Sequence, residues 1–211
     1  MTDIEELSAS ERAYLLIRDG VLEGTYAPGT MIGEASLAKE FSLSRTPVRL
    51  ALGRLQQEGW IEIFPKRGAL VKGLSERQIA ELANTRWLLE STSVADAPEA
   101  ECQRMAQRQL ASIEAQQEAF AQGDLRQFVN LTIAFHRRFV EVSGNGIRLE
   151  LYDRLADRHR FALFSTGDML QSRCAEIIAE HKALVELMAN RDAQGFAERL
   201  QLHMSDSGAA S

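Results

Sequence analysis

The chain has 211 residues, of which 45% are hydrophobic and 26% charged, and its formal net charge at pH 7 is −6. This length and apolar content suffice for two compact domains that need no disulfides to hold them together. The acidic balance excludes a general polyanion binder, so any affinity for nucleic acid has to come from a local basic surface.

Cysteine usage and the lengths of the apolar runs indicate the cellular compartment of the protein. Its two cysteines, Cys102 and Cys174, lie far apart and outside any metal-binding or redox spacing, as expected of a reduced cytoplasmic protein. No apolar run at the N-terminus has the length of a signal sequence, and no stretch approaches the roughly 18 apolar residues of a membrane span. A soluble cytoplasmic protein without a membrane partner is therefore expected.

The N-terminal part of the chain predicts three short helices. Apolar residues at helical spacing predict helices over residues 10–23 and 34–41, with a Pro-Gly turn at residues 28–29 between them. A third helix is expected to begin after Ser44, which can act as N-cap, and to end at Gly59. Only three residues separate the second helix from the third. This spacing predicts a helix-turn-helix, whose second helix can enter a major groove.

The third helix has a buried stripe and a cationic flank. At about 100° per residue, Arg45, Thr46 and Arg49 fall together on a solvent-facing flank near the helix N-terminus. The residues at i, i+3, i+4 and i+7 are apolar, which is the spacing of a helix face that packs against a core. This stripe consists of Val48, Ala51, Leu52 and Leu55.

A basic hairpin is predicted directly after the third helix. Residues 60–64 and 69–72 are β-prone, and the tip between them reads Pro-Lys-Arg-Gly. From residue 39 to residue 72, seven Lys and Arg side chains stand against three Glu, which gives a local charge of +4. Such a surface binds phosphates through counterion release. The alternative is a solvated charged face on an ordinary helical bundle, but capped helix, tight turn, paired arginines and basic hairpin together favour DNA binding.

The segment "LAKEFSLSRTPVRLALGRLQQEGWIEIFPKRGALVKG", with the preceding "YAPGTMIGE", resembles the winged helix-turn-helix of GntR-family bacterial transcription regulators over roughly residues 10–74. The resemblance implies base and phosphate contacts from the third helix, and an approach of the wing backbone to the minor groove at Gly68. One departure is Leu50, where the family commonly has an acidic residue; it is expected to be exposed. The candidate DNA-contacting residues are Ser44, Arg45, Thr46, Arg49, Lys66, Arg67 and Gly68.

From Ser75 onward the pattern is helical throughout. Ser75 can cap a new helix, so a domain boundary is expected there, with a DNA-binding domain over residues 1–74 and an effector-binding and dimerisation domain over residues 75–211. The predicted fold is mainly α, a winged helix-turn-helix with a small β-hairpin wing followed by an all-α bundle of six to seven helices. The predicted helices of the bundle span residues 75–94, 99–122, 124–142, 146–165, 168–190 and 192–204.

Three of the four histidines, His136, His181 and His203, stand at the edges of apolar faces on three different helices. A single one would be interpreted as a core histidine that a backbone carbonyl satisfies. Three that converge are different, because each buried imidazole needs a partner for its polar nitrogens and one metal ion can satisfy all three. The three histidines are therefore candidate metal ligands.

The segments "FVNLTIAFHRRFVEVSGN", "EHKALVELMANRD" and "LQLHM" are similar to the all-helical FCD effector domain of the FadR subfamily of GntR regulators. The resemblance implies a divalent transition metal, Zn²⁺, Ni²⁺ or Mn²⁺, held by three His and an Asp four residues before the first of them. In this chain that position is Thr132, whose hydroxyl is a poor ligand for such ions. Two outcomes stay open: a three-His site completed by water or by the effector's carboxylate, or a pocket that has lost the metal.

The same resemblance implies a small organic acid as effector. Arg86 is the candidate cation for its carboxylate, although an ordinary i,i+4 salt bridge with Glu90 accounts equally well for both residues. Thr132 and His159 are the other candidate effector-binding residues, and the sequence leaves His159 either in the pocket or on the surface.

The sequence thus predicts a ligand-responsive transcription regulator, not an enzyme. It is expected to bind a palindromic double-stranded operator as a homodimer and, following the tendency of the family, to act as a repressor. Two alternatives remain. One is a metal-dependent hydrolase, because a three-His metal can activate water; however, Glu180, the acidic neighbour of His181, is expected to face solvent. The other is a regulator that senses the metal itself.

Overall fold

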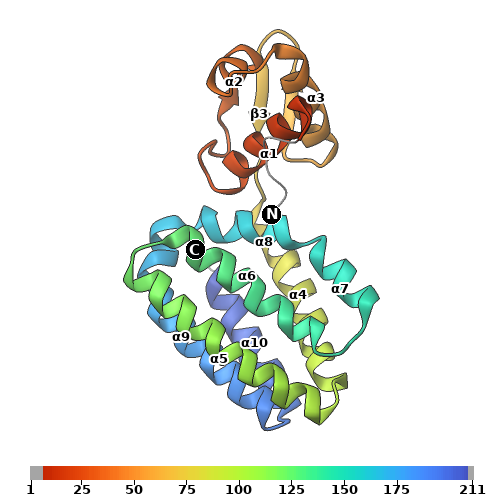
Figure 1. Cartoon of the computed structure of the whole chain (residues 1–211), viewed down its shortest axis with the longest axis vertical. Helices are drawn as coiled ribbons and strands as arrows, with labels where there is room; N and C mark the ends of the chain where they lie inside the picture. The colour runs from red at the N-terminus through yellow and green to blue at the C-terminus, as the bar shows by residue number, and fades with distance from the viewer. Residues whose placement is uncertain (1–6, 209–211) are drawn as a thin grey trace. The chain divides into compact units, whose positions relative to one another are not determined.

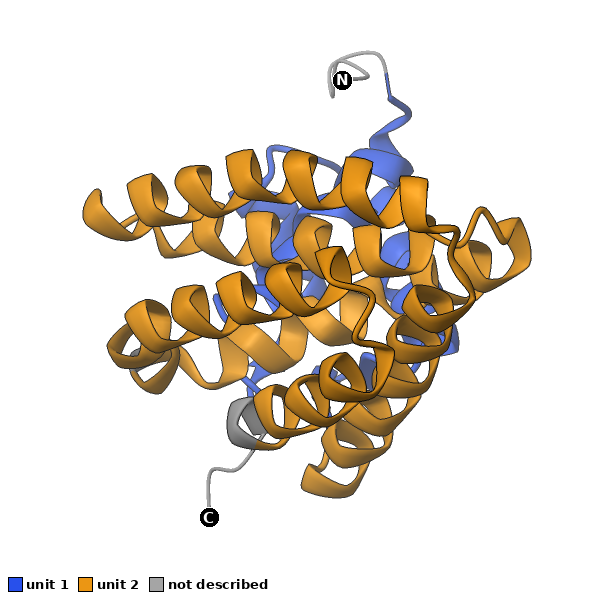
Figure 2. Ribbon diagram, turned by 90° about the horizontal axis from the view of Figure 1, so that it is seen from below, with its two compact units in different colours: residues 1–74 blue, residues 75–211 orange. Residues whose placement is uncertain are grey.

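The structure, a computed structural model, describes residues 7–208, apart from the side chains at position 168 and at positions 206–208. It divides into two compact units, residues 1–74 and residues 75–211, shown in separate colours in Figure 2. The chain has the predicted fold class: a helix-turn-helix with a small antiparallel sheet, followed by a unit built from helices (Figure 1). Within residues 7–208, no helix is both long and apolar enough to cross a bilayer.

The first unit contains the three predicted helices and the predicted hairpin. Its strands form one sheet in the order β1-β3-β2, and the hairpin closes with Phe64 opposite Gly68. The pairing of β1 with β3 was not predicted, because a strand of two residues has no detectable alternation and forms only when a neighbour pairs with it. The elements are α1 (Ala9–Leu22), β1 (Met31–Ile32), α2 (Glu34–Glu40), α3 (Arg45–Gln57), β2 (Ile61–Phe64) and β3 (Gly68–Val71).

Helix α3 is oriented by its apolar stripe. All four predicted stripe residues are at most 2% exposed, and α3 packs against α1 and α2. Ser44 is the N-cap, as expected, but its side chain accepts no cap hydrogen bond from the described residues. One of the two usual donors is missing, because Pro47 occupies the third helical position and has no N–H to donate. Because the stripe faces the core, the flank of α3 that carries Arg45, Thr46 and Arg49 is exposed.

Between residues 75 and 208 the structure has seven helices. The segment predicted as one helix over residues 146–165 is two, because the chain turns at residues 154–155. No Gly or Pro marks this break, so the local pattern could not show it. The helices are α4 (Glu76–Asp96), α5 (Glu99–Ala121), α6 (Leu125–Glu141), α7 (Gly146–Asp153), α8 (Ala156–Ser165), α9 (Gly167–Ala189) and α10 (Ala193–Gly208).

Polar caps and aromatic packing fix the ends and the interior of this bundle. Ser75 and Gln78 form a capping box at the start of α4, and Asp124 accepts a hydrogen bond from the Gln127 N–H at the start of α6. Asp192 accepts one from the Gly195 N–H before α10. Figure 1 shows α5 and α9 running side by side, with α6 against α5. Four buried phenylalanines fill the core between the helices: Phe128, Phe135, Phe139 and Phe196.

Candidate metal cluster and candidate DNA-contacting surface

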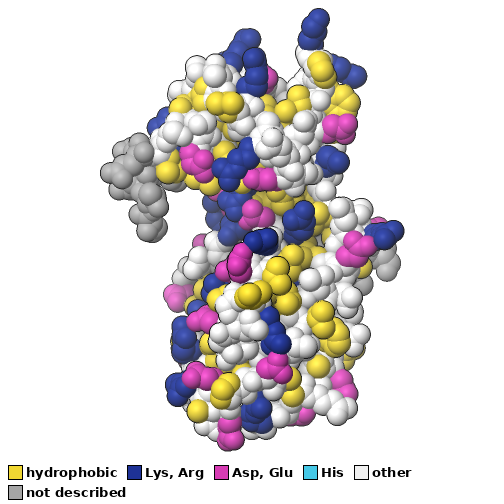
Figure 3. Space-filling view, turned by 90° about the vertical axis from the view of Figure 1, so that its right-hand side faces the viewer, with side chains coloured by type: hydrophobic (Ala, Val, Ile, Leu, Met, Phe, Trp, Pro, Cys, Tyr) yellow, Lys and Arg dark blue, Asp and Glu magenta, His cyan; other side chains and the backbone are white. Residues whose placement is uncertain are grey.

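The three predicted histidine ligands meet inside the helical unit. His136 comes from α6, His181 from α9 and His203 from α10, and one nitrogen of each lies within 4.8 Å of the others. All three side chains are buried, and on the face seen in Figure 3 no histidine of the described residues is visible. Phe135 stacks on the His181 ring with a centroid distance of 4.2 Å. The core packing of the bundle therefore holds the imidazoles in place.

Each imidazole has its Nδ1 atom beside a side-chain oxygen. An ionised carboxylate or an amide oxygen only accepts, so in each pair Nδ1 is assigned the proton and donates it. In that tautomer the Nε2 atoms carry the lone pairs that a metal ion would bind, as in metal-bound histidines whose outer partners fix the tautomer. The pairs are His136 with Glu90 at 2.8 Å, His181 with Gln116 at 2.7 Å and His203 with Glu180 at 2.6 Å.

The geometry of the inner nitrogens fits a shared cation. The Nε2 atoms of His136 and His203 lie 3.1 Å apart, which is also hydrogen-bond distance. Two ligands about 2.1 Å from one ion would lie about 3.0 Å apart at right angles and about 3.4 Å apart at the tetrahedral angle. The Nε2 atom of His181 is buried and has no hydrogen-bond partner among residues 7–208. Burial lowers the pKa of His136 and of His181 well below the usual value, which keeps both in the neutral form that binds metals.

A cavity of about 40 Å³ adjoins the cluster. Arg86, Thr132 and His159 line it together with His136 and His203. The Thr132 hydroxyl and the His159 Nδ1 atom are buried and bond to nothing in the described part of the chain. Buried polar atoms without a partner cost roughly 1–3 kcal/mol each. The cavity is therefore suited to a small polar guest.

Arg86 and His159, two of the candidate effector-binding residues, are both buried and line the cavity. Arg86 is buried, donates to Glu90 Oε1 at 3.2 Å and to the Tyr152 hydroxyl at 3.3 Å, and still lines the cavity. The expected alternative, an i,i+4 pair with Glu90, is thus present. His159 lies in the pocket, 4% exposed, and burial lowers its pKa well below the usual value. Burial also raises the pKa of Glu90, to about 7, against the opposing charge of Arg86.

Glu180 does not face solvent, contrary to the expectation. Its side chain is 12% exposed and accepts the hydrogen bond from His203 Nδ1. Successive helical residues do point about 100° apart, but the long Glu180 side chain reaches α10, which packs against α9. Sequence reasoning also missed Gln116, although a signal existed: Gln116 follows Ile113 at i+3 on the buried face of α5.

The candidate DNA-contacting residues on α3 lie at one end of the helix. Ser44, Arg45, Thr46 and Arg49 are all exposed. Arg49 has a partner within the unit: its Nε and Nη2 atoms donate to the Glu34 carboxylate at 3.1 and 3.0 Å, while its side chain stays 69% exposed. This pairing lowers the pKa of Glu34 and raises that of Arg49. Leu50 is 63% exposed, as expected.

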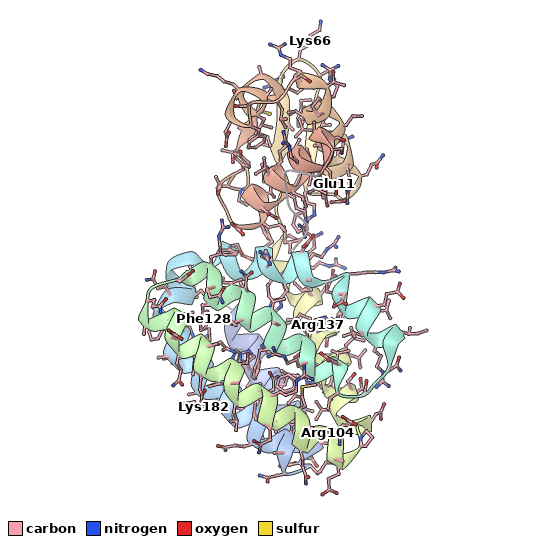
Figure 4. All side chains as sticks on the ribbon, in the orientation of Figure 1. Glu11, Lys66, Arg104, Phe128, Arg137 and Lys182 are labelled. Carbon is pink, nitrogen blue, oxygen red and sulfur yellow. The ribbon has the colours of Figure 1, made fainter. Side chains whose placement is uncertain are left out.

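The tip of the hairpin carries the remaining candidates. Lys66 and Arg67 are exposed, and Figure 4 shows Lys66 extending from the hairpin tip away from the rest of its unit. Gly68 has a φ of +117°, and a Cβ there would lie 2.6 Å from the carbonyl oxygen of Ile32. The need for glycine at this position therefore arises inside the sheet, where β1 pairs with β3, whether or not DNA also approaches it.

Comparisons with known proteins agree with both halves of the fold. The model for bacterial regulatory proteins of the gntR family matches residues 9–71, and the model for the FCD domain matches residues 81–206. An HTH-type transcriptional regulator from an unstable DNA locus of Streptomyces ambofaciens is 35% identical over 137 residues, which cover 63% of this chain and 56% of that protein.

The HTH-type transcriptional repressor RspR of Escherichia coli (strain K12) is 24% identical over 207 residues, covering 93% of this chain and 86% of that protein. Among solved structures, a GntR transcriptional regulator from Rhodococcus sp. RHA1 superposes with a TM-score of 0.78 at 19% identity, covering 96% of each chain. Identity this low establishes a shared fold alone.

Proposed function

Because this chain belongs to the gntR family of bacterial regulatory proteins and carries an FCD domain, we propose that it represses its target by binding an operator as a homodimer, and that a small organic acid in the helical unit relieves this repression. Membership makes it a DNA-binding transcriptional regulator. Repression is favoured because RspR, similar over 93% of this chain, is named a repressor.

The operator is read by the exposed end of α3. Arg45, Thr46 and Arg49 lie in the first two turns of the helix and carry the donors that contact base edges in a major groove. Lys66 and Arg67 at the wing tip, with Ser44, contact phosphates. One such unit offers few contacts, so two of them on a palindromic operator give the affinity and specificity of a regulator.

The effector site is the histidine cluster with its cavity. The observation that carries this assignment is the convergence of three buried imidazoles, each of which has its Nδ1 atom beside an oxygen acceptor. His136, His181 and His203 would hold a divalent ion such as Zn²⁺, Ni²⁺ or Mn²⁺, which supplies a Lewis-acidic centre for an oxygen of the effector. Arg86, Thr132 and His159 line the space where the effector carboxylate binds.

Occupancy of this cavity biases the placement of the two DNA-binding units in the dimer. Linkage makes the effect reciprocal: whatever factor the effector removes from operator affinity, the operator removes from effector affinity. Direct catalysis by the cluster has less support, because Glu180, the carboxylate nearest in sequence to His181, accepts a hydrogen bond from His203 and is held as its partner.

The experiment starts by selecting operator fragments from the genome of the source organism. Operator affinity of the full-length protein is then measured with and without small organic acids, in metal-loaded and metal-stripped form. The proposal expects one class of acids to weaken binding at least about fivefold, the lower range of allosteric coupling. Affinity that follows the metal and ignores every acid would instead identify a metal sensor, and steady turnover of esters or amides would identify a hydrolase.

A further inference from the structure

We propose that Thr132 makes metal binding by the histidine cluster conditional on a small carboxylate, so that cation and anion enter the buried site as a pair. The inference rests on the proposed function, since it takes His136, His181 and His203 as metal ligands. It adds a condition for metal binding: the ion is bound tightly only when the molecule in the cavity carries a negative charge.

The first step is the balance of charge around the cluster. Two carboxylates contact the histidines from outside, and each has an arginine nearby, although Arg173 is shared between Glu180 and Glu176. Glu90 pairs with Arg86 at 3.2 Å, and Glu180 lies 3.7 Å from Arg173. Three neutral imidazoles add no charge. The charge of a dication bound by this set would therefore be only partly balanced inside the protein, where an uncompensated charge is costly.

The second step is the position of Thr132. It stands four residues before His136 on α6, so both side chains point to the same face of the helix, and both line the cavity. An acidic side chain at this position could supply both a ligand and a negative charge. A threonine hydroxyl supplies neither, but it can donate one hydrogen bond. The charge has to come from the guest.

The third step is that the cavity already holds groups for an anion. The Thr132 hydroxyl and the His159 Nδ1 atom are both buried without partners in the described residues, and both face the cavity that the cluster borders. The Thr132 hydroxyl can donate to a carboxylate oxygen, and so can His159 in the tautomer that carries its proton on Nδ1. The volume of about 40 Å³ fits a guest the size of formate or acetate, or the carboxylate end of a longer acid.

The test measures Zn²⁺ affinity of the full-length, metal-stripped protein. Free Zn²⁺ is set by a chromogenic chelator, and the affinity is compared in chloride buffer and in the same buffer with millimolar acetate. For the wild type, acetate should tighten Zn²⁺ binding at least about tenfold, within the usual range of coupling between sites. By linkage, acetate should bind the Zn²⁺-loaded protein more tightly than the stripped protein by the same factor.

Two variants at one position isolate the charge. T132D should bind Zn²⁺ tightly in chloride alone and gain less than about twofold from acetate. T132N is the matched control, because an asparagine side chain has nearly the same shape as an aspartate but carries no charge. The Zn²⁺ affinity of T132N should therefore still depend on acetate. Circular dichroism and thermal melting of both variants establish that they are folded before their affinities are compared.

The outcomes separate this inference from the proposed function. Wild-type protein that binds Zn²⁺ equally well with and without acetate overturns the pairing but keeps the metal site. An equal gain when the same concentration of additional chloride replaces the acetate overturns the role of the carboxylate. A protein that takes up no Zn²⁺ under any condition, as wild type or as T132D, overturns the metal site itself and the pairing with it.

Discussion

Arg49 on α3 and Glu34 on α2 form a two-bond ion pair across the helix-turn-helix, with donor–acceptor distances of 3.1 and 3.0 Å. The pair uses the Nε and Nη2 atoms of the guanidinium group and leaves Nη1 outside it. Glu34 thus restricts the orientation of a side chain that is 69% exposed. A restricted arginine loses less conformational entropy when it bonds to a base or a phosphate.

The pair leads to a prediction for the Glu34→Gln variant. Removal of the carboxylate frees Arg49 to move and removes a negative charge from the proposed DNA-contacting surface. We expect weaker binding to the selected operator and stronger binding to scrambled DNA, so that the specificity ratio falls several-fold. Fluorescence anisotropy with both DNAs at one salt concentration measures the ratio. An unchanged ratio would show that the ion pair plays no part in recognition.

The Arg49→Ala variant tests the recognition helix directly. A specific arginine contact contributes roughly 1–3 kcal/mol, so operator affinity should fall at least about tenfold while helical content and oligomeric state stay the same. Arg77→Ala is the matched control, since Arg77 is an exposed arginine whose recorded ion pair is with Glu81 in the second unit. Equal effects of the two substitutions would contradict the assignment of α3.

The Gly68→Ala variant should destabilise the wing. Its φ of +117° disfavours any side chain, and the added Cβ would lie 2.6 Å from the backbone of Ile32. We expect a loss of roughly 1–3 kcal/mol, together with reduced operator affinity. Gly24→Ala separates the two causes, because Gly24 has a φ of +81° but a Cβ there would meet no atom of the described residues within 4 Å beyond its chain neighbours. If both variants melt at the same temperature, the contact with Ile32 is not the cause.

The capping box predicts the effect of Ser75→Ala. Its side chain accepts a hydrogen bond from the Gln78 N–H, which the substitution removes. The free energy of unfolding should fall by about 1 kcal/mol, as measured by urea denaturation. Ser44→Ala is the comparison: Ser44 is also an N-cap, but its side chain accepts no cap bond in the described structure, so a smaller loss of stability is expected. The reverse order would be inconsistent with these caps.

The metal assignment predicts the behaviour of His181→Ala. The variant should lose most of its bound divalent metal and its response to the effector while it keeps its helical fold. Because a ligand that binds only the folded state raises stability, chelation should lower the melting temperature of the wild type and leave that of the variant unchanged. Metal content is measured by elemental analysis. Wild-type protein that carries no metal, or an equal effect of chelation on both proteins, counts against the site.

Much of the DNA-binding unit could be predicted from the sequence, because its helices are marked by the spacing of apolar residues within each short segment. The apolar spacing from Val48 to Leu55 selects the buried side of α3, and this choice alone turns Arg45 and Arg49 outward. The same local pattern failed at residues 154–155, where the chain breaks a helix without Gly or Pro. There α7 and α8 each pack against α6, a contact between separate helices that no local pattern shows.

The sequence by itself determined which residue types stand on which face of each helix, and so it placed His136, His181 and His203 on three inward faces. Only the tertiary structure decided their partners. Glu90 and His136 are 46 positions apart in the chain, and Gln116 and His181 are 65 apart. Helical periodicity describes a few turns of one helix, whereas these contacts depend on how separate helices pack. A buried polar atom finds its partner through that packing, and no local pattern records it.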